Sequence, residues 1–167
     1  AVTPGKELSP ELAAKGMRLS KAPMLDITHD TFNMADPIFG KNKLLRQAIS
    51  MAVDPTPFIE LFYNGRALPA QGPIPPGMGG YDPNLKNPYR QYNLSKAKEL
   101  LAKAGYPDGK GLPPIEYVTI ADSTHRQMNE YYTKAFQMLG LELKVNSYSW
   151  PEFQASVKNR RGQMWGY

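Results

Sequence analysis

The chain has 167 residues, enough for one compact core and short for two, so a single domain is expected. Its 16 prolines and 14 glycines predict many fixed turns. The absence of cysteine excludes a disulfide scaffold, a thiol nucleophile and a thiolate metal site. No run approaches the roughly 20 apolar residues that cross a bilayer, and the start, AVTPGKELSP, lacks the basic end and apolar run of a signal peptide.

The positive charge raises the alternative of a basic nucleic-acid-binding domain. The net charge is +5 and the pI is about 9.3, but the basic residues are scattered. The only dense cluster contains Lys158, Arg160 and Arg161. A solvated face is the favoured interpretation, and salt-dependent oligonucleotide binding would distinguish the two.

The first third predicts a strand between helices. A short helix should begin near Ser9, which is followed by Pro10 and an acid, and should end at Gly16. Residues 24–34, MLDITHDTFNM, alternate in character and are rich in β-branched residues, which favours a strand. Breakers at Pro37 and Gly40 then end it.

Two helices should follow and pack as a pair. The first covers about 41–53, with an apolar stripe made of Leu44, Leu45, Ala48, Ile49 and Ala52. The second begins at Asp54-Pro55 and ends at Asn64-Gly65. Its buried face should consist of Phe58, Ile59 and Phe62.

Residues 69–93 contain too many prolines and glycines for a helix or a central strand. An unanchored loop of that length is uncommon in a compact domain. We therefore expect an ordered loop that buries Ile74, Met78 and at least one tyrosine. A helix capped by Ser95 and stopped by Gly105 should follow.

The last third alternates strands with helices. Strands are expected at 115–120, 141–147 and 163–167, and helices at about 124–139 and 150–159. Capping boxes are predicted for Thr124 with Gln127 and for Ser149 with Glu152. With the strand at 24–34, this order predicts an α/β lobe around a mixed sheet.

Catalytic and metal-binding patterns are weak. The two histidines, His29 and His125, lie on separate elements without acids at ligand spacing. No serine lies in a strained Gly-x-Ser-x-Gly setting, and no glycine-rich phosphate loop opens a helix. Ten Tyr, six Phe and two Trp are the notable content, and they can form core or line a recognition cleft.

Several stretches together are similar to one family. They are FNMADPIFGKNKLLRQAISMAVD (32–54), GPIPPGMGGYDP (72–83), AKELLAKAGYPDGKG (97–111), LGLELKVNSYSWPEF (139–153) and QMWGY (163–167). They resemble the family 5 extracellular solute-binding proteins, the oligopeptide, dipeptide and nickel receptors of ABC importers. The resemblance covers about residues 24–167.

This resemblance implies a binding module and not an enzyme, with no cofactor. The family's fold is the type II periplasmic-binding-protein fold, in which two mixed α/β lobes enclose a ligand. Such receptors are periplasmic or extracellular, are often lipid-anchored, and deliver the ligand to a membrane permease. Peptide is the commonest ligand in the family, and nickel, oligosaccharide and opine-like compounds stay open.

The family's polypeptides are several times longer than this chain. Their first lobe, small extra domain and returning C-terminal segment have no counterpart here. In the family, the strand that resembles 164–167 leads through Gly-Trp to an aspartate that can hold a peptide amino group. We therefore expect residues 1–167 to form a single partial domain, one lobe of a larger receptor.

The resemblance also implies a ligand-facing set: Trp150, His125, Asp122, Ser123 and Thr124. All lie at strand-to-helix junctions, where open α/β sheets place their ligands. Two alternatives stay open, because Trp150 can fix its helix to the core and His125 can be a solvated first-turn residue. Arg46 is expected to make a structural ion pair or hydrogen bonds.

Overall fold

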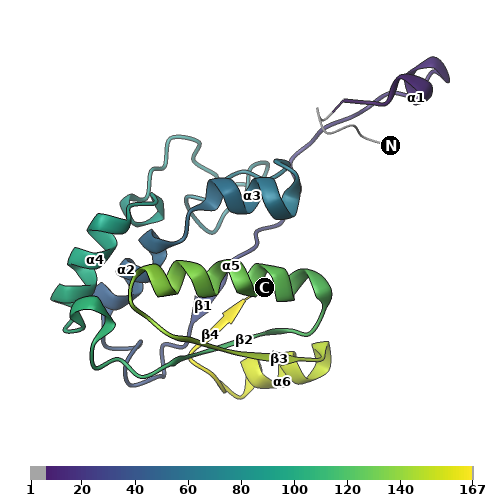
Figure 1. The fold of residues 1–167 in the computed structure, drawn as a ribbon. Coiled ribbons are helices and arrows are strands. Elements are labelled where there is room, and N and C mark those ends of the chain that lie inside the picture. Colours follow the sequence, from purple (N-terminus) through teal and green to yellow (C-terminus); the bar gives the residue numbers. More distant parts are fainter. Residues whose placement is uncertain (1–6, 167) are drawn as a thin grey trace.

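The computed structural model describes residues 7–166, which form one four-stranded sheet with helices on both faces (Figure 1). The first six residues and Tyr167, the last residue of the expected final strand, lie outside this range. The elements are α1 (Pro10–Ala14), β1 (Asp30–Phe32), α2 (Lys43–Ala52), α3 (Pro55–Tyr63), the 3-10 helix η1 (Pro88–Arg90), α4 (Leu94–Lys103), the 3-10 helix η2 (Pro107–Gly109), β2 (Ile115–Ile120), α5 (Ser123–Met138), β3 (Leu143–Tyr148), α6 (Trp150–Lys158) and β4 (Met164–Gly166).

The sheet is mixed, as predicted. Its strand order is β1-β4-β2-β3, in which β2 is parallel to both of its neighbours and β1 is antiparallel to β4. The parallel connections β2-α5-β3 and β3-α6-β4 supply one helix to each face (Figure 1). None of the helices among residues 7–166 has the length and hydrophobicity needed to span a bilayer.

The two faces of β2 serve two cores, because successive side chains of a strand point to opposite sides. Tyr117 joins the main core, which α2, α4 and α5 complete. Val118 points the other way and packs with Phe153 and Trp165 beneath α6. The apolar stripe predicted for α2 is realised, since Leu45, Ala48, Ile49 and Ala52 are buried and Leu44 packs against them.

The residue that caps a helix is the one whose side chain can accept from an amide of the first turn, and two of the predicted caps are wrong. Asp122, and not Thr124 with Gln127, caps α5 by accepting from the His125 backbone N–H. Asn93, and not Ser95, caps α4 by accepting from the Lys96 N–H. In both cases the cap residue has an extended backbone, which aims its short side chain at the free amides of the first turn.

The box predicted at the start of α6 is present. The Ser149 backbone N–H and hydroxyl both donate to Glu152 Oε2, at 3.0 and 2.6 Å. This arrangement satisfies one of the amides that a helix start leaves open and fixes the turn after β3.

The predicted strand at 24–34 is much shorter in the structure. Only Asp30–Phe32 pair with β4, while Met24 and Leu25 are 77% and 65% exposed. The alternating pattern is compatible with a strand, but no strand among residues 7–166 pairs with 24–29. Similarly, β3 starts at Leu143 and not at 141, because the Leu141 N–H still bonds the Phe136 carbonyl at the end of α5.

The loop at 69–93 does not bury the residues expected to anchor it. Ile74 and Met78 are 38% and 47% exposed, and its three tyrosines are all exposed as well. The loop is instead shaped by local turns and by Gln71, whose side-chain oxygen accepts from the Asn87 backbone N–H. Backbone hydrogen bonds can therefore hold a proline-rich loop whose apolar side chains still face outward.

Candidate functional site

The predicted site residues follow two neighbouring strands. Ile120, the last residue of β2, is paired with Tyr148, the last residue of β3, and the Ala121 N–H donates to the Tyr148 carbonyl at 2.8 Å. Because the strands are parallel, the loops that follow them emerge at one edge of the sheet. This register brings 121–125 and 148–150 side by side.

Asp122 and His125 form a close pair within the first turn of α5. The carboxylate accepts from the His125 backbone N–H at 2.8 Å and lies 2.6 Å from His125 Nδ1. These bonds, the backbone one above all, hold the pKa of Asp122 below its ordinary value. An ionised carboxylate can only accept, so Nδ1 carries the proton and Nε2 is the nitrogen that this pair leaves for a ligand.

Trp150 presents one face of its ring at the same edge. The side chain is 49% exposed and stacks on Phe153, with 5.8 Å between ring centroids and 17° between the planes. Phe153 is fully buried, so the indole rests on the core beneath α6 without entering it. Tyr148, which sequence reasoning missed, is 38% exposed two residues earlier. Tyr148 could have been found from the sequence as an aromatic residue directly after the strand predicted at 141–147.

Ser123 and Thr124 are exposed in the first turn of α5, next to the Asp122–His125 pair. The edge therefore combines two exposed aromatic rings, an oriented imidazole and two hydroxyl groups. Flat rings offer large contact area at low conformational cost, and the imidazole and hydroxyls offer hydrogen bonds. Among residues 7–166, no group of three or more His, Asp or Glu side chains is arranged to hold a metal ion.

A second group that sequence reasoning missed lies at the start of β1. Tyr117 donates to Asp30 Oδ1 at 2.8 Å, and Tyr132 on α5 also bonds this carboxyl group. Asp30 as a residue is only partly buried, but its carboxyl lies among these rings. Desolvation raises the pKa of Asp30, although the two tyrosine bonds oppose that rise. Burial, followed by the nearby Asp30 charge, raises the pKa of Tyr117 and of Tyr132.

The cluster requires glycine on the neighbouring strand. Gly166 pairs with Asp30, and a Cβ at Gly166 would overlap the Tyr117 hydroxyl. The partners in this cluster come from β1, β2, α5 and β4, and β1 and β4 lie near opposite ends of the chain. No local pattern could have revealed it.

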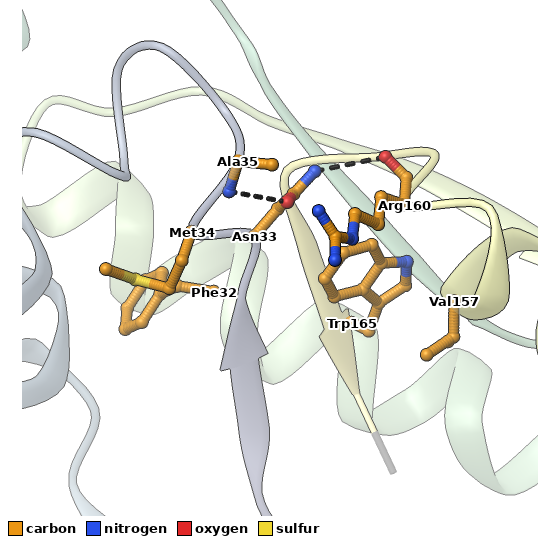
Figure 2. Close-up of a pocket in the computed structure, with 7 residues that line it drawn as sticks. All are labelled: Phe32, Asn33, Met34, Ala35, Val157, Arg160 and Trp165. Atoms are coloured by element: carbon orange, nitrogen blue, oxygen red, sulfur yellow. Dashed lines mark hydrogen bonds between the residues drawn. The ribbon is translucent and has the colours of Figure 1, made fainter.

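An open depression of about 480 Å³ lies at the opposite edge of the sheet, where β2 and β4 begin. Figure 2 shows its lining of Phe32, Asn33, Met34, Ala35, Val157, Arg160 and Trp165. The Asn33 amide donates to the Arg160 and Gly162 carbonyls and accepts from the Ala35 N–H. The polar atoms of the Asn33 side chain therefore hold the turn before β4, which indicates that Asn33 has a structural role.

Arg46 is structural, as expected. Its guanidinium donates to the Phe39 and Gly40 carbonyls, of which the second is 3.4 Å away. These bonds close the turn that precedes α2. Arg46 thus takes no part in the edge formed by β2 and β3.

Residues 2–167 match the family described as "Bacterial extracellular solute-binding proteins, family 5 Middle". The chain belongs to this family. The match confirms the resemblance drawn from the five sequence stretches. Family 5 proteins are solute-binding proteins that act outside the cytoplasm, and nothing in the match indicates an enzyme.

Two characterised relatives illustrate the range of the family. The chain is 28% identical over 138 residues to heme-binding protein A of Haemophilus influenzae, and 27% identical over 153 residues to a dipeptide-binding protein of Escherichia coli. These matches cover 80% and 89% of this chain but only 24% and 28% of the length of the relatives. The chain thus spans about a quarter of their length.

Solved structures confirm the fold class. The periplasmic binding protein DppA of Helicobacter pylori, in complex with the peptide STSA, superposes with a TM-score of 0.75 at 26% identity, over 84% of this chain and 26% of that protein. HbpA2 of Haemophilus parasuis superposes with a TM-score of 0.75 at 25% identity, over 87% of this chain and 29% of that protein. The chain therefore has the mixed α/β lobe of a type II periplasmic-binding-protein fold, as predicted.

Proposed function

We propose that this chain is one partial domain, a lobe of the solute-binding receptor of an ABC importer, and that peptide is its ligand. The observation that carries the proposal is the edge where β2 and β3 end together, with Trp150 half exposed and His125 oriented by Asp122. The other lobe of the receptor and a membrane permease are its partners. The receptor acts in the periplasm or outside the cell.

Peptide suits this edge chemically. The rings of Trp150 and Tyr148 can cover an apolar side chain or a peptide plane, and His125 Nε2 can hydrogen-bond the backbone. Asp122 is engaged by His125, so it serves as a positioning residue and not as the anchor of a ligand amino group. Relatives that bind dipeptides, and the neighbour solved with STSA, support this ligand class.

The test is calorimetry of the full-length receptor with a mixture of short peptides. Trp150→Ala should weaken peptide binding about tenfold, or about 1.4 kcal/mol, because it removes one stacking surface. Met138→Ala is the matched control, since Met138 is 45% exposed at the far end of α5. Equal affinities for the two variants would exclude Trp150 from the site, and no peptide binding by the intact receptor would refute the ligand class.

Two other ligand chemistries have support among the relatives. Heme-binding protein A resembles this chain at 28% identity, and so does AgaA, solved with agropinic acid, with a TM-score of 0.68. Haem and agropinic acid therefore belong beside the peptides in the calorimetry. A labelled oligonucleotide should show no salt-dependent shift, and such a shift would revive the nucleic-acid alternative.

A further inference from the structure

Arg160, in the turn between α6 and β4, has a backbone conformation that arginine rarely adopts. Three non-glycine residues among residues 7–166 have φ in the left-handed region: Asn64 at 51°, Asp108 at 53° and Arg160 at 54°. Asn and Asp tolerate this region because their short side chains can hydrogen-bond the local backbone, and arginine lacks that compensation. Residues held in this region against their preference cluster at ligand sites, so Arg160 is a candidate for a functional residue.

Other side chains hold the backbone of this turn in place. The Asn33 amide donates to the Arg160 carbonyl at 3.1 Å and to the Gly162 carbonyl at 2.9 Å. The Trp165 indole N–H donates to the Arg161 carbonyl, also at 2.9 Å. These bonds fix the turn through its carbonyl groups, so its conformation does not depend on the side chain of Arg160.

The Arg160 side chain lines the open depression of about 480 Å³ at the edge of the sheet where β2 and β4 begin. Figure 2 shows it running from the turn toward the indole of Trp165. No side chain among residues 7–166 forms an ion pair or a hydrogen bond with its guanidinium group. A cation that is held on a fixed turn and left unpaired can bind an anion.

The neighbouring charges do not neutralise this guanidinium. Lys158 and Arg161, which are close to Arg160 in the chain, are exposed cations. Asp36 follows the segment that lines the depression, but both of its carboxyl oxygens are engaged. Oδ1 accepts from two backbone N–H groups of the next turn, and Oδ2 accepts from the Gln163 amide at 3.2 Å. The local charge therefore favours a negatively charged ligand.

We propose that this depression binds a small aromatic carboxylate. Its volume is within the range of small-molecule sites, which is about 300–1,000 Å³. The planar guanidinium can pair with a carboxylate through two parallel hydrogen bonds. The apolar part of the lining can cover a ring, and it consists of Phe32, Met34, Ala35, Val157 and Trp165.

A carboxylate suits this site better than a phosphate. Asn33 uses both of its amide hydrogens on the turn, and the Trp165 N–H is also engaged. Arg160 is thus the side-chain donor that the lining leaves available, and one guanidinium matches one negative charge. The site lies at the edge opposite Trp150, so the proposal does not depend on peptide as the ligand of the receptor.

The test is a titration of the full-length receptor with 3-phenylpropionate, followed through the ¹³C-methyl NMR signals of its methionines. Met34 lines the depression and is 58% exposed, and Met138 on α5 reports on a distant surface. Substitution of each by leucine assigns its signal. We expect the Met34 signal to move with a dissociation constant of about a millimolar, as a ligand of this size allows, while the Met138 signal stays in place. The neutral analogue 3-phenylpropanamide should bind at least about tenfold more weakly.

Two substitutions of Arg160 separate binding from backbone structure. Arg160→Gln keeps the left-handed strain, and Arg160→Gly relieves it. Both should weaken 3-phenylpropionate binding at least about tenfold, and Arg160→Gly should do so without lowering the melting temperature. Asn64→Gly is the matched control, because it makes the same backbone change at the end of α3 and should leave binding unchanged.

Several results would overturn the proposal. They are a Met34 signal that does not move, unchanged binding in both Arg160 variants, and an equal response of Met34 to inorganic phosphate. Trp150→Ala should bind 3-phenylpropionate as the wild type does. Loss of binding in that variant would assign the probe to the ligand edge and would also overturn the proposal. Because the probe is not a peptide, a failure of the peptide assay leaves these results unaffected.

Discussion

Asp30 illustrates how a single carboxyl group ties together distant parts of the chain. It starts β1, accepts from Tyr117 on β2 and is also bonded by Tyr132 on α5. Burying the charged form is costly, and two hydroxyl donors offset part of that cost. The net effect is a raised pKa, so the folded protein holds the Asp30 proton more tightly than the unfolded chain does.

The raised pKa predicts a pH dependence of stability. The stabilising contribution of Asp30 is complete below its unfolded pKa, near 3.8, and is lost as the pH rises through the folded value. Asp30→Asn keeps the acceptor oxygen without the charge. The melting temperature of this variant should therefore rise relative to that of the wild type as the pH increases from about 4 to about 7. Circular dichroism melts across that range measure it.

Asp26→Asn provides the control, because Asp26 is exposed in the segment before β1. That variant should follow the wild-type melting curve at every pH. If the Asp30→Asn curve also runs parallel to the wild type, Asp30 does not titrate with a raised pKa.

Gly166 is expected to tolerate no side chain. Gly166→Ala should lower the free energy of unfolding by about 1–3 kcal/mol, because the added methyl overlaps the Tyr117 hydroxyl. Tyr117→Phe in the same chain should recover part of that loss by removing the hydroxyl. Gly79→Ala is the control, since a Cβ there meets nothing within 4 Å. Urea unfolding of the wild type and the three variants checks this, and an unchanged midpoint for Gly166→Ala would contradict it.

At the level of elements, the start of α4 allows the observed cap, Asn93, to be compared directly with the predicted one, Ser95. Asn93→Ala should destabilise the protein by about 1 kcal/mol, because the Lys96 N–H loses its side-chain acceptor. Ser95→Ala should cost nothing or stabilise slightly, since Ser95 lies inside α4 and alanine is the better helix former. Thermal unfolding of the two variants decides it, and a larger loss for Ser95→Ala would restore the cap predicted from the sequence.

Elements with strong local signals could be predicted closely. The limits of β2, at 115–120, match the expectation because its run is rich in β-branched and aromatic residues and is bounded by Pro114 and Asp122. The helix α2 could be predicted from the apolar stripe that it buries. The extent of β1 could not be predicted, because it depends on β4, which lies at the other end of the sequence. Local propensity cannot show whether a partner strand is long enough.

The candidate site could be predicted only in part, for similar reasons. That Trp150 and the 122–125 loop follow strands is visible in the sequence, and parallel strands place such loops together. The pairing of Asp122 with His125 could not be predicted, because it depends on the hydrogen-bond geometry of the first turn of α5. The ligand-facing role of these residues stays a prediction.

At the scale of the whole molecule, the 167-residue chain tested alone should bind peptide only at millimolar concentrations or above. A two-lobed receptor surrounds its ligand, and one edge of one lobe leaves most of that ligand hydrated. The loss of several kcal/mol would lower a micromolar affinity about a thousandfold, at about 1.4 kcal/mol per tenfold. Calorimetry with the peptide mixture measures it, and a micromolar dissociation constant would show that this lobe is a complete receptor.

The antiparallel pairing of β1 with β4 has a consequence for synthesis. Asp30 and Gly166 are adjacent in the sheet but separated by most of the chain, so β1 leaves the ribosome long before its partner exists. At typical translation speeds of about 5–20 residues per second, the delay is on the order of ten seconds. During that time β2, α5 and β3 can assemble from contacts closer in sequence, while Phe32 and the Asp30 carboxyl face solvent. The nascent chain is therefore exposed to mispairing and to chaperones mainly through its first strand.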